Sequence, residues 1–412
     1  MEVVHERCAG LDVHQKTVVA CVLTAGPGGR ATPEVRTFGT MAADLAALAD
    51  WLAERGVTHV ALESTGVYWR PIWNLLEGRV ALVLANAQHV KAVPGRKTDV
   101  RDCEWLAQLL RHGLVRGSYV PDRARRELRE LTRYRAALVR ERAAEVNRLE
   151  KTLEGANVKL GAVATNLAGV SARAMLRALA DGTTAPAALA DLARGRLRRK
   201  LPELERALAG RVGPHQRFLL ARQLAHLDDL DELLAQVSDE IAARLRPHEA
   251  ALARLEGIPG VGRRVAEVLL AEVGPDPAAH FPDARHLASW AAMCPGNHQS
   301  AGKRTSGRTR RGCPWLRSAP VEAAQAASRS KDSYLGAQFR RLAARRGKRR
   351  AAVAVGHTIL TIAYYLLTRE RAYEDLGLDY FDRRDREHVT DRLVRRLERL
   401  GHRVSLEPAM AS

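Results

Sequence analysis

The 412-residue chain has only five cysteines, and no two of them are spaced as a CxxC pair. This pattern argues against a disulfide framework and against a zinc ribbon, and it favours the reducing cytoplasm. The chain also lacks a basic segment followed by an apolar one at its start, and its longest apolar run, near residues 353–367, is interrupted by Gly356, His357 and threonines. We therefore expect neither a signal peptide nor a membrane-spanning helix, and no membrane partner.

The chain also has fewer acidic residues than basic ones. The 47 Asp and Glu residues face 66 Lys and Arg residues, which gives a net charge of +19 and favours a polyanionic partner. The excess is local, because residues 1–121 hold 13 basic and 12 acidic residues, whereas residues 301–350 hold 15 and 2. A solvated helix face is the other interpretation of that basic stretch. The distribution predicts a near-neutral N-terminal domain and a basic C-terminal one.

The hydrophobic content of 46% excludes wholesale disorder, and the length suits two or three domains. Residues 1–121 alternate between β-branched and amphipathic segments, which predicts an α/β domain. A helix capped by Thr40 follows the second expected strand. We expect strands over residues 11–23, 34–38, 57–62 and 80–84, and further helices over residues 68–77 and 100–111.

The pattern changes after residue 121 to long, charged helices punctuated by leucine. Residues 122–250 predict two long helices packed antiparallel, as a helical or coiled-coil hairpin, with short helices over residues 155–214 between them. Residues 251–350 predict a third, mostly α-helical domain, and residues 351–412 a C-terminal helical extension.

Four acidic residues of the first domain are placed where carboxylates are unusual or paired. Asp12 lies in an apolar strand, Glu63 ends another strand, and Asp99 and Asp102 are three positions apart at the start of a helix. A strand edge, a turn and a helix cap are the ordinary interpretations of these positions. Several carboxylates that meet are also suited to Mg²⁺, which takes oxygen ligands.

Two further motifs lie in the third domain. Residues 255–273 have the form of a helix-hairpin-helix, in which Gly260 and Gly262 let backbone N–H groups approach a phosphate; an ordinary interhelical turn is the alternative. Ser300 begins a segment rich in basic residues, and a serine that attacks a phosphodiester needs positive charge around the phosphate oxygens. The residues that supply it would be Lys303, Arg304, Arg308, Arg310 and Arg311.

The segments GLDVH around Asp12, ALESTG around Glu63 and KTDVRD around Asp99 and Asp102 together resemble the acidic tetrad of the RuvC-like DEDD transposases of the insertion-sequence 110 type. The Ser-x-Gly-Lys segment at Ser300 resembles the serine-bearing C-terminal domain of the same family. Ala301 departs from the family pattern, in which glycine is expected. The resemblance runs to about residue 345.

That resemblance implies a RuvC-like (RNase H-like) N-terminal domain whose tetrad binds Mg²⁺, with Ser300 as the nucleophile that forms a transient phosphoserine link to DNA. It implies excision and insertion of a mobile element by DNA strand exchange. It also implies a structured noncoding guide RNA, the bridge RNA, as a partner. The resemblance further implies a homo-oligomer, a dimer or a tetramer, in which the RuvC-like site of one subunit lies beside the serine of another.

Two other functions remain open at this point. A metal-dependent nuclease of the Holliday-junction type would use the tetrad to hydrolyse DNA with water and would not need Ser300. A non-catalytic nucleic-acid-binding protein would keep the basic surface and use neither site.

Overall fold

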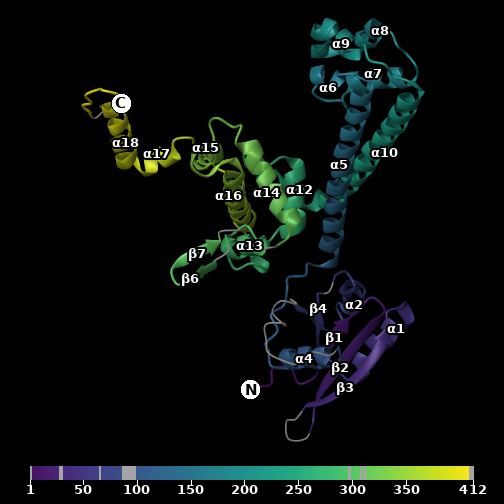
Figure 1. Ribbon diagram of the computed structural model, residues 1–412. Coiled ribbons are helices and arrows are strands. Elements are labelled where there is room, and N and C mark those ends of the chain that lie inside the picture. The colour runs from purple at the N-terminus through teal and green to yellow at the C-terminus, as the bar shows by residue number, and fades with distance from the viewer. Residues whose placement is uncertain are drawn as a thin grey trace. The chain divides into compact units, whose positions relative to one another are not determined.

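The computed structural model describes residues 2–26, 31–64, 66–85, 99–295, 298–306, 309 and 312–407 (Figure 1). It describes only the backbone of residues 25, 99–101, 298–300 and 304–306. The chain divides into two compact units, Met1–Arg123 and Ala124–Ser412.

The first unit is built on a five-stranded mixed sheet in the order β3-β2-β1-β4-β5. Strands β1, β2 and β3 pair antiparallel, and β1, β4 and β5 pair parallel. The strands are β1 (Cys8–Val13), β2 (Thr17–Ala25), β3 (Ala31–Gly39), β4 (His59–Glu63) and β5 (Ala81–Ala85). Helices α1 (Ala42–Glu54) and α2 (Trp69–Leu76) pack on one face, and α4 (Asp99–Arg111) packs on the other. The sheet layered by helices agrees with the expected α/β domain.

Two local predictions for this unit are wrong. The apolar stretch 11–23 is not one strand, because exposed polar residues at positions 14–16 turn the chain between β1 and β2, where the His14 amide donates to the Thr17 carbonyl at 2.9 Å. Thr40 does not cap α1, because its hydroxyl donates to the Gln15 carbonyl at 3.0 Å. Met41 takes the N-cap position instead.

The second unit begins with the predicted antiparallel pair of long helices, α5 (Arg123–Gly155) and α10 (Pro214–Leu245), seen side by side in Figure 1. Leu138 of α5 packs on Leu230 and Leu234 of α10. Nearer the start of α5, Arg244 of α10 lies 3.1 Å from Glu127. Contacts that advance along one helix as they retreat along the other establish the antiparallel direction. The far end carries α6 (Leu160–Val163), α7 (Val170–Ala180), α8 (Pro186–Asp191) and α9 (Leu201–Leu208).

The remaining elements form a helical core with one β-hairpin. The core helices are α11 (Glu249–Glu256), α12 (Arg263–Val273), α13 (Ala284–Trp290), α14 (Pro314–Ala327), α15 (Tyr334–Arg346) and α16 (Lys348–Thr368). The hairpin strands are β6 (His298–Ser300) and β7 (Lys303–Ser306), and α17 (Tyr380–Arg384) and α18 (Arg386–Arg399) follow the core. The hairpin is an addition that the helical pattern does not predict.

Helix α16 is the central helix of this core. It packs against α11, α13, α14 and α15. By length and composition α16 is apolar enough to cross a membrane, but 56% of its apolar window is buried inside the protein. The expected boundary at residue 351 falls within α16, because the apolar face of this helix completes the core. The C-terminal extension therefore begins after Thr368, and it still contacts the core where the Tyr334 ring of α15 stacks on Phe381 of α17.

Candidate functional site

Asp12 and Glu63 lie side by side at the ends of two neighbouring strands. Leu11 of β1 is the register partner of Leu62 in the parallel strand β4, and each carboxylate comes one residue later. Side chains alternate between the faces of a sheet, so Asp12 shares a face with Gly10, and Glu63 shares one with Ala61. Gly10 and Ala61 both lie against α4. The register therefore turns both carboxylates toward the α4 side of the sheet.

Helix α4 brings the other two acidic residues to the same side. Its buried residues Cys103, Leu106 and Ala107 pack on the sheet. The approach is close, since a Cβ on Gly10 would overlap the Cys103 carbonyl oxygen and lie 2.6 Å from the amide nitrogen of Ala107. Asp102 is half-buried and stands one turn before Leu106. Asp99 is the first residue of α4, and its side chain lies outside the described residues.

Asp12 is the most buried of the three carboxylates whose side chains are described, with only 9% of the residue exposed. A carboxylate removed from water needs a partner, and His14 Nε2 lies 3.1 Å from its Oδ2 atom. The layer beneath it holds the buried thiols of Cys8, Cys21 and Cys103. Burial raises the pKa of Cys8 to about 11, so this thiol is neutral at physiological pH and does not add to the negative charge of the site.

Carboxylate oxygens are the donors that Mg²⁺ prefers, so the chemistry of this cluster fits that ion. Across the described residues, no three His, Cys, Asp or Glu side chains form a group that could hold a metal ion. The sheet register juxtaposes Asp12 and Glu63, and α4, which carries Asp102, packs on the same side of the sheet.

Ser300 is the last residue of β6, directly before a two-residue turn. It pairs with Lys303, the first residue of β7. Ala301 and Gly302 between them have φ angles of +46° and +76°, the left-handed values that a tight hairpin requires. The hairpin therefore sets Ser300 at an exposed turn. Its side chain lies outside the described residues.

The predicted basic residues follow the same turn. Lys303 is exposed. Arg304 lies in β7 with only its backbone described, and Arg308, Arg310 and Arg311 lie outside the described residues.

The expected helix-hairpin-helix comprises α11, a turn over residues 257–262 and α12. Its two glycines differ. Gly260 has a φ of +90°, and a Cβ there would overlap the Ala323 carbonyl oxygen and lie 2.7 Å from the amide nitrogen of Ala327, both in α14. Gly262 is the N-cap of α12, is exposed and has no neighbouring atom where a Cβ would stand. Gly260 thus makes room for α14, and Gly262 alone leaves open space at the start of a helix.

Two family models match this chain. One, a DEDD transposase model of the IS110 type, matches residues 9–158, and the other, described as "Transposase IS116/IS110/IS902 family", matches residues 252–340. The first range holds all four acidic residues, and the second holds the glycine turn and Ser300. The chain belongs to the IS110 family of transposases.

Two curated relatives agree with this assignment. The transposase for insertion sequence element IS1111A of Coxiella burnetii is 25% identical over 297 residues, which cover 70% of this chain and 72% of the relative. A protein of Sinorhizobium fredii named y4pF/y4sB is 32% identical over 155 residues, which cover 36% of this chain and 40% of that protein.

This IS110 transposase also contains a cluster of buried ion pairs that the sequence analysis does not predict. Glu272 of α12 is fully buried and receives hydrogen bonds from Arg133 of α5 at 2.8 and 2.9 Å, and Arg129 lies 3.2 Å from it. Arg135 pairs with the buried Glu267 at 2.6 Å. These ion pairs join α5, at the base of the long hairpin, to α12 of the serine-bearing core. The only sequence signal for them is two acidic residues on the otherwise apolar face of α12.

Proposed function

We propose that this transposase excises and inserts a mobile DNA element by strand exchange, with Asp12, Glu63, Asp99 and Asp102 as its metal-binding carboxylates and Ser300 as its nucleophile. The observation that carries the proposal is the register of β1 and β4, which sets Asp12 beside Glu63 facing α4. Carboxylates at the neighbouring ends of two parallel strands of a mixed sheet support the RuvC-like assignment of this domain.

The covalent step that we propose conserves the phosphodiester. The Oγ atom of Ser300 attacks a DNA phosphorus, an Oγ–P bond forms, and the bond from phosphorus to the oxygen of the leaving strand breaks. The serine proton ends on that leaving oxygen, which becomes a hydroxyl. Attack by a hydroxyl of another strand reverses the step and frees the serine. Atoms and charge balance without a nucleotide cofactor.

Each group has a physical task in this scheme. When bound, Mg²⁺ supplies positive charge that stabilises the attacking and leaving oxygens of phosphoryl transfer. Asp12, Glu63, Asp99 and Asp102 would hold it, and His14 orients the Asp12 carboxylate. Lys303, one residue past the turn from Ser300, places a cation beside the phosphate that the serine attacks.

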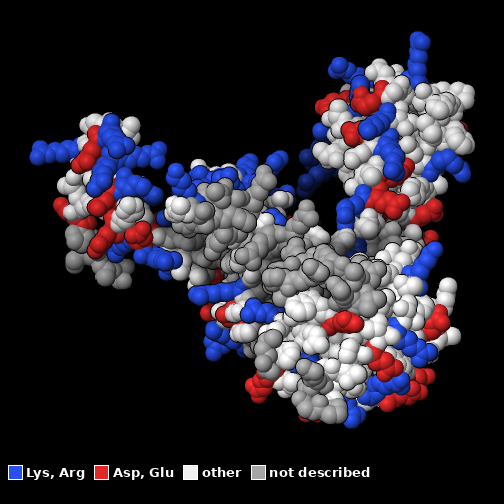
Figure 2. Space-filling model, turned by 60° about the horizontal axis from the view of Figure 1, so that its bottom comes forward, with Lys and Arg blue, Asp and Glu red and all other residues white. Residues whose placement is uncertain are grey.

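A guide RNA and a homo-oligomer belong to the same proposal. Pairing between an RNA and DNA would choose the sequence, and the protein would contact backbone and shape, which suits a basic surface. On the face in Figure 2, Lys and Arg side chains gather over α15, where Arg340, Arg345 and Arg346 are exposed. Tyr134, near the base of the long hairpin, and Phe218, near its far end, are exposed at 49% and 65%, and each offers an apolar contact to a second subunit in a dimer or tetramer.

Trapping of the covalent intermediate tests the proposal. The full chain, incubated with element-end DNA and Mg²⁺, should yield a protein–DNA adduct on a denaturing gel, and Ser300→Ala should abolish it. Ser306→Ala, a serine change in the same hairpin, is the matched control and should leave the adduct intact. Clean DNA hydrolysis that survives Ser300→Ala would instead establish the nuclease alternative.

The non-catalytic alternative makes the opposite prediction for the carboxylates. If the protein only binds nucleic acid, the double variant Asp12→Asn and Glu63→Gln keeps every activity of the wild type. In our proposal this variant still binds DNA but forms no adduct, with or without added Mg²⁺.

A further inference from the structure

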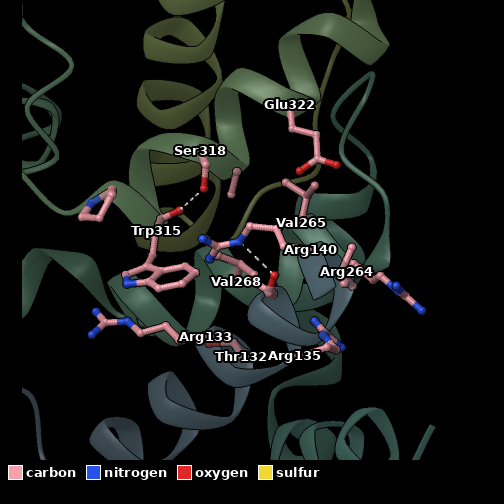
Figure 3. Close-up of a pocket in the computed structure, with 14 residues that line it drawn as sticks. Thr132, Arg133, Arg135, Arg140, Arg264, Val265, Val268, Trp315, Ser318 and Glu322 are labelled. Carbon is pink, nitrogen blue, oxygen red and sulfur yellow. Dashed lines mark hydrogen bonds between the residues drawn. The ribbon is translucent and has the colours of Figure 1, made fainter. Parts of the chain in front are cut away.

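A groove runs between helices α5, α12 and α14 of the second unit (Figure 3). Its volume is about 550 Å³, within the range of pockets that enclose small ligands. The floor is apolar, with Val139 from α5, Val265 and Val268 from α12 and Ala319 from α14. The groove therefore favours a flat or apolar group over a fully solvated ion.

One aromatic residue forms a wall of the groove. Trp315, in the first turn of α14, is half-buried, and the guanidinium of Arg140 stands over its ring at 4.7 Å from the centroid. Figure 3 shows this guanidinium reaching across the groove from α5. Arg140 is exposed, and its Nε donates a 3.1 Å hydrogen bond to the Ala136 carbonyl of its own helix. The ring face is thus covered by a flexible side chain that a planar group can displace.

Four arginines line the groove, and a glutamate lies among them. Arg133 and Arg135 line it but are fixed by their ion pairs with Glu272 and Glu267. Arg264 also lines it, and it is exposed two residues after Gly262. A phosphate held at the start of α12 would therefore lie next to the rim of the groove. Glu322, exposed at the other side, offers a carboxylate that can accept a hydrogen bond from an amino or imino group.

We propose that this groove holds one unpaired base of a single-stranded nucleic acid, stacked on Trp315 and covered by Arg140, while Arg264 contacts the adjacent phosphate. The proposal rests on the proposed function in that it assumes a nucleic-acid substrate or guide. The bound base would belong to an unpaired stretch of the strand that lies away from the reacting phosphate.

The relative strength of the two stacking contacts favours the base. A cation over an aromatic ring at an exposed site raises the equilibrium constant for that contact about two- to fivefold. A base stacked on an aromatic side chain raises the binding constant about five- to 150-fold. Arg140 need not be lost from the contact, since a guanidinium plane also stacks on the outer face of a base. Displacement of Arg140 from the ring is therefore favourable overall.

Oligomers with and without bases test the proposal. The full chain is titrated with oligothymidylate, with oligouridylate, and with an abasic strand of the same length that keeps every phosphate. Wild type should bind one of the two base-bearing strands about tenfold more tightly than the abasic strand, and its preference for DNA or RNA identifies the source of the base. Trp315→Ala should remove this difference, and Trp315→Phe should keep most of it.

A spectroscopic readout and a matched control complete the experiment. A stacked base should quench tryptophan fluorescence in wild type more than in Trp315→Phe, because that variant lacks the proposed stacking ring. Tyr365→Ala removes an aromatic ring of α16 that is 40% exposed and is covered by the Arg369 guanidinium at 4.6 Å, as Trp315 is by Arg140, and it should change neither binding nor quenching.

Each result has a distinct meaning. If wild type binds base-bearing and abasic strands equally, or if Trp315→Ala keeps the difference, the base site is refuted while nucleic-acid binding stands. If no strand binds at all, the proposed function fails as well. If Trp315→Ala instead abolishes self-association of the chain, the groove holds a side chain of a second copy and the proposal is overturned.

Discussion

Gly260 provides the sharpest test of how the helix-hairpin-helix turn is built, through the substitution Gly260→Ala. The residue has a φ of +90°, which costs an alanine about 1–2 kcal/mol. The new Cβ would also overlap the backbone of α14 at Ala323 and Ala327. A helix backbone does not rotate aside as a flexible side chain does, so overpacking adds about 1–3 kcal/mol. We expect a total loss of about 2–5 kcal/mol in the free energy of unfolding.

Gly262→Ala is the control in the same turn. Its φ is −91°, and no atom lies where a Cβ would stand, so the expected loss is that of an N-cap glycine, below about 1 kcal/mol. Urea unfolding followed by far-ultraviolet circular dichroism measures both variants, because most helices lie in the second unit. Equal, small losses in the two variants would refute the packing role of Gly260. Weaker nucleic-acid binding by folded Gly262→Ala would support phosphate contact at α12.

Three further predictions concern other parts of the chain. Glu272→Ala leaves Arg129 buried without its carboxylate partner, so urea unfolding should show a loss of about 3–5 kcal/mol; a loss below about 1 kcal/mol would contradict this. Ala301→Gly relieves a φ of +46° and should raise the free energy of unfolding by about 1 kcal/mol, and a decrease would count against the hairpin turn. Burial raises the pKa of Cys8 from 9.0 to about 11, so the folded chain holds this proton longer than the unfolded chain and stability falls between about pH 9 and pH 11. Thermal unfolding of Cys8→Ala should show a smaller fall than wild type over that range, and parallel curves would refute the assignment.

The sequence predicts the elements whose periodicity is strong and uninterrupted. The leucine seam of the long helices predicts their antiparallel packing, which the Leu138–Leu234 and Glu127–Arg244 contacts confirm together. The β-branched stretch 11–23 gives strand structure but not the turn within it. Its polar residues at 14–16 do not include the glycine or proline that marks a turn, so the break between β1 and β2 depends on pairing with the neighbouring strands.

The site shows the same division between local and tertiary information. Asp12 and Glu63 are recognisable by their places in apolar strands, but only the register of β1 with β4 makes them neighbours. Gly260 and Gly262 look alike in sequence, and a phosphate or a helix can each require a glycine. The structure separates them because α14, more than fifty residues later, packs on Gly260. Contacts between residues so far apart in the sequence leave no local sequence pattern.

The positive charge divides into two kinds by burial. Arg129, Arg133 and Arg135 are matched to Glu272 and Glu267, so these arginines serve the fold and are not available to a polyanion. A second set lies exposed at the turn between α15 and α16: Arg345 and Arg346 of α15 and Lys348, Arg349 and Arg350 of α16. Consecutive exposed cations repel one another and contribute nothing to a core. We predict that they contact phosphates of the DNA, in which case their removal should weaken nucleic-acid binding and its salt dependence while leaving stability unchanged.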